Sequence, residues 1–214
     1  AIWMASSSGI LEWKEGEPSR LLGRGTVPFI RNCEVRALIT LTDGAVLVGQ
    51  GSGIGIATTA STGYMLKLSE AGRDFSNCHV ISMYEDHLQR IWIATEGQGI
   101  ICMTAKAGKH RAFTCHQYAP VAGNYPLEEA TAVYEDVNHQ LWAISNSGGL
   151  FLLDGETDKF IPVNYRIISV WGASIPSRVI VVEKYGFLPI RGWCGWHRQV
   201  NLVLQPLIII WRMA

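Results

Sequence analysis

Residues 80–100 read VISMYEDHLQRIWIATEGQGI, and residues 130–150 read ATAVYEDVNHQLWAISNSGGL. The two stretches align without a gap, and several of their differing positions exchange similar residues. Self-similarity of this kind is the sequence signature of a repeat fold. Five aligned positions are identical: Tyr84/Tyr134, Glu85/Glu135, Asp86/Asp136, Trp92/Trp142 and Gly99/Gly149.

Weaker copies of the unit flank these two. Residues 35–54 carry Leu47 in the place of the tryptophan, and residues 168–187 carry Ile180 there, with Gly186 closing the unit. Residues 2–10 resemble the second half of a unit whose first half is missing, with Trp3 as its marker. The marker therefore recurs at steps of 44, 45, 50 and 38 residues.

A period near 45 residues fits either paired helices or propeller blades, and the local pattern decides between them. Residues 46–48, 91–93 and 179–182 are β-branched and aromatic runs, which favour strands. Asp43-Gly44, just before the first run, is a hairpin turn signal. Each of the two closely similar units, which begin at residues 80 and 130, contains four short apolar segments separated by polar or glycine turns.

The sequence therefore predicts an all-β fold: a β-propeller arc of four to five four-stranded antiparallel blades, forming an incomplete ring. Residues 1–187 are assigned to the blades, and residues 188–214 to an atypical tail of unknown structure. The tail contains no Asp or Glu but holds Trp193, Trp196 and Trp211. The chain begins with Ala1 rather than Met, so we expect it to be a fragment or a processed product.

The repeated residues have a structural interpretation. A tryptophan midway along the second strand can fill the wedge between neighbouring blades, as a large core residue would. The Glu-Asp pair before the hairpin suggests acid–base chemistry, but a carboxylate repeated at a turn more often accepts backbone N–H bonds. We therefore expect Asp86 and Asp136 to stabilise their turns.

The string Tyr-Glu-Asp, a short turn, Ile-Trp-Ile-Ala-Thr and a closing Gly-Ile or Gly-Leu resembles the two-component regulator propeller repeat. The resemblance covers residues 1–187 and is sharpest at 80–104 and 130–153. It implies the periplasmic sensor region of a hybrid two-component histidine kinase of Bacteroidetes. Such a region would bind an oligosaccharide and regulate carbohydrate use through a cytoplasmic kinase.

That family's propellers have about seven blades each, so the resemblance implies that further blades of a parent chain complete the ring. No kinase, receiver or DNA-binding segment is recognisable in the sequence. The alternatives are a propeller module for protein–protein interaction and, less favoured, a propeller enzyme. A sugar site would gather aromatic and amide side chains on one rim, whereas an enzyme would gather titratable groups.

Other classes of function find little support. The formal net charge is zero, which gives no electrostatic footprint for nucleic acid. The apolar run at 202–211 is too short to span a bilayer. The glycine-rich residues 49–55 miss the dinucleotide-binding spacing, so we interpret them as an inter-strand loop. No catalytic motif is recognised, and we expect no cofactor; the ligand-binding residues stay unassigned.

The cysteines raise two further questions. Cys78-His79, Cys115-His116 and Cys194 with His197 match no standard zinc spacing, so no metal site is predicted. Cys102 and Cys115 fall on the two arms of a predicted hairpin and could face each other there. A disulfide between them is one hypothesis for a periplasmic protein, and a reduced, packed pair is the other.

Overall fold

The computed structural model describes residues 1–31, 34–106, 111–118, 127, 129–146, 149–163, 166–169 and 180–183. The chain divides into two compact units, Ala1–Pro162 and Val163–Ala214. The regular structure within the described residues consists of strands, without a helix, so the all-β prediction is confirmed. The described residues accordingly include no helix long and apolar enough to span a membrane.

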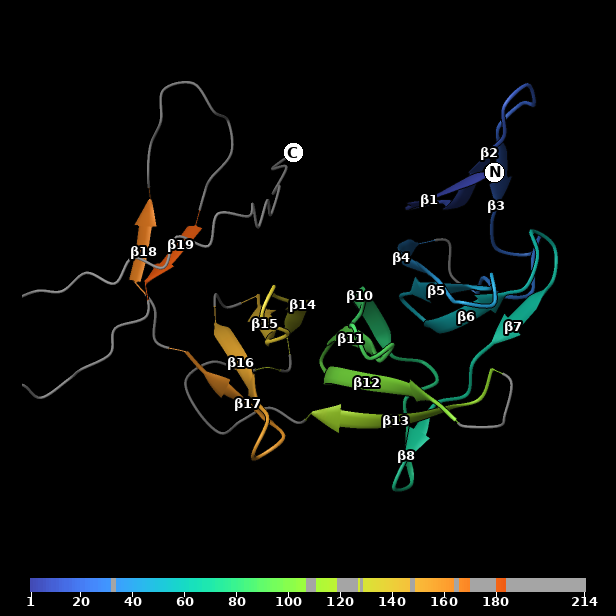
Figure 1. Cartoon of the computed structure of the whole chain (residues 1–214). Coiled ribbons are helices and arrows are strands. Elements are labelled where there is room, and N and C mark those ends of the chain that lie inside the picture. Colours follow the sequence, from blue (N-terminus) through green and yellow to red (C-terminus); the bar gives the residue numbers. More distant parts are fainter. Residues whose placement is uncertain are drawn as a thin grey trace, which may run out of the picture. The chain divides into compact units, whose positions relative to one another are not determined.

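Unit Ala1–Pro162 contains four successive antiparallel sheets whose strands pair in chain order (Figure 1). Between the second and third sheets lies a small pair, β8 (Ser69–Glu70) and β9 (Arg73–Asp74). The four sheets are β1 (Ile2–Ser6), β2 (Gly9–Trp13) and β3 (Arg20–Leu22); β4 (Val35–Thr40), β5 (Val46–Gln50), β6 (Gly53–Ala57) and β7 (Gly63–Met65); β10 (His79–Glu85), β11 (Ile91–Glu96), β12 (Gly99–Ala105) and β13 (Phe113–Tyr118); and β14 (Ala130–Glu135), β15 (Leu141–Ser145), β16 (Leu150–Asp154) and β17 (Lys159–Pro162).

The sheets correspond to the predicted blades. The first sheet has three described strands, and Trp3 on β1 pairs with Glu12 on β2, as Trp92 on β11 pairs with Cys102 on β12. It therefore holds the second, third and fourth strands of a blade, so this sheet lacks only the first strand rather than the whole first half expected from the sequence. The described blades do not close a ring.

Unit Val163–Ala214 has one described strand pair, β18 (Arg166–Ser169) and β19 (Ile180–Glu183), which run antiparallel. They are the first two strands expected of the last unit, with Ile180 on the second. Gly186 and the tail 188–214 lie outside the described residues, so the boundary at 187/188 stays a prediction.

Apolar side chains fill the spaces between successive sheets of the first unit. The first strands adjoin one another: β10 lies against both β4 and β14. Leu47 belongs to the core between the second and third sheets, and Trp92 to the core between the third and fourth. Trp3 stacks on Phe29, with 6.4 Å between ring centroids, on the side of the second sheet. Trp3, Leu47 and Trp92 thus pack between blades, as predicted.

Trp142 departs in part from that expectation. It occupies the equivalent place, because Tyr134 pairs with Trp142 as Tyr84 pairs with Trp92. Its ring is only half-buried, however. Leu141 and Ala143 face the core shared with the third sheet, so Trp142 faces the opposite side. The fourth sheet is the last one in its unit, and that side has no further sheet of the unit against it.

The glycine-rich segment is a tight β-hairpin rather than a loop, because only residues 51–52 lie outside β5 and β6. No helix follows it, which excludes a dinucleotide-binding turn. A Cβ atom on Gly55 would lie 2.1 Å from the carbonyl oxygen of Phe29. Gly53 has a φ of +109°, and a Cβ atom there would lie 2.1 Å from the carbonyl oxygen of Ser76. Glycine at these positions lets neighbouring backbone approach.

The disulfide hypothesis for Cys102 and Cys115 is wrong. Cys102 pairs with His116, and Cys115 pairs with Met103, so the two cysteines are one residue out of register. Side chains alternate between the faces of a sheet, which places the two thiols on opposite faces. Both are free, and burial raises the pKa of the Cys102 thiol to about 11.

Candidate functional site

The repeated aspartates organise the turns between the first and second strands. In the β10–β11 turn, Oδ1 of Asp86 accepts the backbone N–H groups of Leu88, at 3.0 Å, and of Arg90, at 2.8 Å. In the β14–β15 turn, Oδ1 of Asp136 accepts the corresponding N–H groups of Asn138 and Gln140, at 2.8 and 3.0 Å. The structural role predicted for both carboxylates is confirmed.

Each aspartate also binds the tryptophan of its own sheet, which the sequence analysis did not predict. The indole N–H of Trp92 donates to Oδ2 of Asp86 at 2.8 Å, and that of Trp142 to Oδ2 of Asp136 at 2.9 Å. In the third sheet, Nε of Arg90 donates to the same Oδ2 at 2.6 Å. In both sheets the aspartate and the tryptophan are six residues apart, and this spacing places them at hydrogen-bond distance.

A cluster of titratable side chains joins the turns of the third and fourth sheets. We call His87, Glu135 and His139 the turn cluster. His87 follows Asp86 in the β10–β11 turn, Glu135 ends β14, and His139 lies in the β14–β15 turn with a φ of 61°. Their ligand atoms lie within 4.8 Å of one another, and the two imidazole centroids are 4.0 Å apart.

Glu135 is the centre of the turn cluster. Its Oε1 contacts Nδ1 of His87 and lies 3.2 Å from Nδ1 of His139, while its Oε2 accepts the backbone N–H of His87 at 2.8 Å. Burial raises the pKa of the carboxyl, but the bonds from His87 and the contact with His139 outweigh it and hold the pKa below its usual value. Glu135 is therefore an anion at neutral pH.

Sequence reasoning did not find the turn cluster. Glu135 is a repeated residue, but His87 aligns with Val137 and His139 aligns with Gln89, so the repeat carries no sign of the histidines. Of the histidines weighed as ligands, His79 pairs with Glu96 and His116 with Glu70, and neither belongs to a three-ligand group in the described residues. Cys194 and His197 lie outside the described residues.

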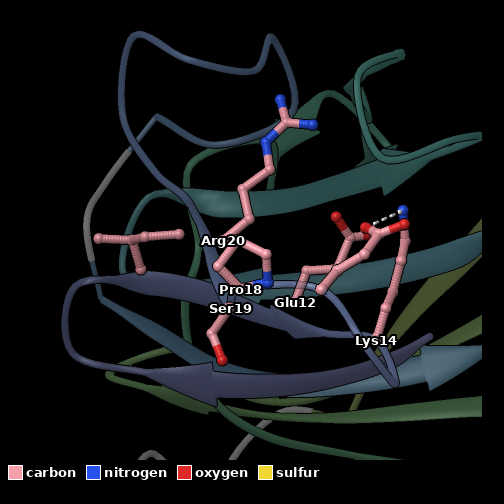
Figure 2. A pocket seen from close by; sticks show the side chains of 7 residues that line it. Glu12, Lys14, Pro18, Ser19 and Arg20 are labelled. Carbon is pink, nitrogen blue, oxygen red and sulfur yellow. Dashed lines mark ion pairs between the residues drawn. The ribbon is translucent and has the colours of Figure 1, made fainter.

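Two surface hollows lie away from the turn cluster. The first, of about 550 Å³, lies at the β2–β3 hairpin (Figure 2). Its lining is mostly charged, and Nζ of Lys14 lies 3.6 Å from Oε2 of Glu17. No aromatic ring is present among its seven lining residues: Glu12, Lys14, Glu17, Pro18, Ser19, Arg20 and Leu21.

The second hollow, of about 460 Å³, lies between the outer strands β7 and β13, and we call it the outer hollow. It combines the exposed ring of Tyr64 with Phe113 and three cationic side chains. Nε of Arg111 is 2.9 Å from Oδ2 of Asp43, which holds that cation in place. The two remaining cations, Lys67 and Lys106, are exposed.

Comparison with known proteins agrees with the fold. Residues 74–97 match the family model described as two component regulator propeller. These residues contain the first of the two closely similar turns, including Asp86 and Trp92. The resemblance found in the sequence is therefore shown in this segment. No sequence of a curated protein matches this chain.

Two solved structures are similar. One is the extracellular domain of the B. thetaiotaomicron protein BT3049, assigned to a hybrid two component system: the TM-score is 0.54 and the identity 18%, with 76% of this chain and 21% of that chain covered. The other is PorZ, a surface component of the type-IX secretion system of Porphyromonas gingivalis. Its TM-score is 0.50 and its identity 18%, with 69% of this chain and 22% of that chain covered. This chain spans about a fifth of the length of either structure, and at these identities the likeness concerns the fold.

Proposed function

We propose that this chain is part of the ligand-sensing propeller of an extracytoplasmic, periplasmic two-component sensor, and that the sensor binds an oligosaccharide. The observation that carries the proposal is the two component regulator propeller repeat at residues 74–97, on blades whose fold matches a sensor's extracellular domain. PorZ has a similar fold and is a component of a secretion system, so the fold alone does not select sensing over a part in secretion. The repeat favours sensing.

The residues that line the outer hollow are of the types that bind saccharides, which supports this part of the proposal. The apolar faces of sugar rings stack on aromatic side chains, and sugar hydroxyls bind charged and polar groups. Of the two hollows, only the outer one offers aromatic rings, those of Tyr64 and Phe113. Its cations, Lys67, Lys106 and Arg111, favour a saccharide that carries carboxylate or sulfate groups. We assign the ligand to this hollow.

The proposal is tested by isothermal titration of the full chain with neutral and uronate-containing oligosaccharides. We expect binding of an acidic saccharide, and Tyr64→Ala should weaken it about tenfold, which is about 1.4 kcal/mol. Tyr134→Ala is the matched control, because Tyr134 is as exposed as Tyr64, 45% against 44%, and lies outside the hollow. Lys67→Gln should weaken acidic ligands only. Absence of saccharide binding, or equal losses in the two tyrosine variants, would overturn the assignment.

The parent protein supplies the remaining blades in this proposal. One face of the first sheet exposes large apolar side chains, and we call it the bare face; it comprises Ile2, Met4, Trp13 and Leu21, between 42% and 56% exposed. Register places them together, because Ile2 pairs with Trp13. Apolar faces of this kind pack against a neighbouring blade in propellers. A preceding blade of the parent chain is the occupant we expect.

An enzymatic role is less well supported. The turn cluster is a convergence of titratable groups, which is the feature expected of an enzyme. Its members contact one another, however, and none of them lines either hollow. Neither hollow therefore offers a substrate access to these titratable groups. Ligand binding remains the function that the geometry supports best.

A further inference from the structure

We propose that His87, Glu135 and His139 bind a divalent transition-metal ion of the zinc class, which links the turns of two neighbouring blades. The inference goes beyond saccharide sensing and does not depend on it. The turn cluster supplies two imidazole nitrogens and one carboxylate oxygen. Imidazole and carboxylate are the ligands that Zn²⁺ takes in proteins, and three protein ligands leave a fourth position for water or another ligand.

The spacing of the donor atoms fits a small tetrahedral ion. Ligand bonds of 2.0–2.1 Å place the ligand atoms of a tetrahedral zinc site about 3.3 Å apart. Oε1 of Glu135 and Nδ1 of His139 are 3.2 Å apart, and all three ligand atoms lie within 4.8 Å of one another. Nδ1 of His87 contacts the same oxygen and has to move away from it when an ion enters. Both imidazoles have room to rotate, because His87 and His139 are 38% and 62% exposed.

The surroundings hold the carboxylate in a fixed place. Glu135 is only 7% exposed, and its second oxygen is bonded to the backbone N–H of His87. A hydrogen bond to the second oxygen of a ligating carboxylate orients it toward the metal. The exposed histidines lie on the solvent side, so an ion can enter without opening the core between the sheets.

The simpler interpretation is a metal-free set of His–Glu hydrogen bonds. The chain contains such pairs elsewhere: His116 with Glu70 and His79 with Glu96, each with one histidine to one carboxylate. The turn cluster differs because two histidines from two sheets present the same ring atom, Nδ1, to the same carboxylate oxygen. In the described residues it is the one group of three ligands at metal-binding distance.

The experiment is a titration of the chelator-treated full chain with ZnCl₂ at pH 7.5. We expect one ion per chain at the turn cluster and a higher melting temperature with zinc, because an ion that binds the folded state stabilises it. Glu135→Gln and His139→Asn should each weaken this binding at least tenfold. His139→Asn keeps a residue type that tolerates positive φ, so it tests the site without disturbing the turn.

His116→Asn is the matched control, since His116 also pairs with a glutamate on an exposed surface. It should leave zinc affinity and the zinc-induced shift unchanged. Lowering the pH to 5.5 should weaken binding to the unaltered chain, because the imidazoles must lose their protons to ligate. The proposal is overturned if zinc does not bind, if binding survives Glu135→Gln and His139→Asn, or if His116→Asn weakens it equally.

Discussion

The β10–β11 and β14–β15 hairpins contain the same device in two different settings. In both, one oxygen of the aspartate accepts two turn N–H groups and the other accepts the indole N–H of the tryptophan, at 2.8–3.0 Å. In the first hairpin, Asp86 and Trp92 are 4% and 0% exposed. In the second, Asp136 and Trp142 are only partly buried.

Neighbouring sheets account for the difference. Trp92 lies in the core between the third and fourth sheets, where its ring meets Tyr118 at 5.2 Å and Phe160 at 5.9 Å between centroids. Arg90 adds a guanidinium 5.1 Å from the centroid of the same indole, whereas Gln140 holds the equivalent place in the second hairpin. Each repeat therefore makes these hydrogen bonds within its own hairpin, whereas the burial of the tryptophan depends on the presence of a neighbouring sheet.

The largest contrast between the hairpins is expected from the tryptophans. Trp92→Ala removes a fully buried ring and should lower the free energy of unfolding by about 3–5 kcal/mol. Trp142→Ala removes a half-buried ring and should cost about 1–2 kcal/mol. Urea unfolding of the full chain measures both. Equal losses would mean that Trp142 is buried as deeply as Trp92 in solution.

The aspartates should show the same order at smaller size. Asp86→Ala leaves two turn N–H groups, an indole N–H and the Arg90 side chain without their acceptor, so we expect a loss of about 2–3 kcal/mol. Asp136→Ala exposes its turn groups to water and should cost about 1 kcal/mol. The melting temperatures of the two variants check this. A larger loss for Asp136→Ala would reverse the ranking by burial.

Acid should act on the Asp86 hairpin in a predictable direction. Burial raises the pKa of Asp86, but hydrogen bonds from Trp92 and Arg90 outweigh it and hold the pKa below its usual value. Stability from a lowered carboxyl pKa is present above the unfolded-state value, near pH 4, and is lost as the pH falls toward the folded-state value. Asp86→Ala should therefore flatten the pH dependence of unfolding below about pH 4. An unchanged slope would contradict the lowered pKa.

Changes on the bare face should affect stability least and association most. Substituting Met4 and Leu21 by Gln on this exposed surface should change stability by less than about 0.5 kcal/mol. The unaltered chain should associate through this face, and the double variant should associate less. Light scattering decides between the outcomes. A monodisperse unaltered chain would show that the face needs no partner.

Sequence reasoning reached the repeated features and missed what lies between repeats. The strands, the aspartate turns and the marker positions were predictable because each recurs at a fixed offset. The turn cluster was not, because His87 and His139 sit at different turn positions and meet only when two blades pack together. No pattern within one blade contains that contact.

The register of the strands, meaning which residues pair between neighbouring strands, could not be predicted from the sequence either. Cys102 pairs with His116 rather than with Cys115, and a shift of one residue reverses the face of every side chain in a strand. Each four-stranded sheet also has a register shift in its first strand, between Val35 and Ala37, Val80 and Ser82, and Ala130 and Ala132. Such an irregularity is recognisable only once the partner strand is known.

Trp3, Leu47 and Trp92 each pack toward the following sheet, so each sheet of the first unit is coupled to its nearest neighbours. The second and third sheets each have a sheet of their unit on both sides, whereas the first and fourth have one each. Thermal opening should therefore begin at the first and fourth sheets and reach the buried strands β5, β6, β11 and β12 last. Backbone amides of those four strands would then exchange with solvent most slowly, and the first unit would open from its outer sheets inward.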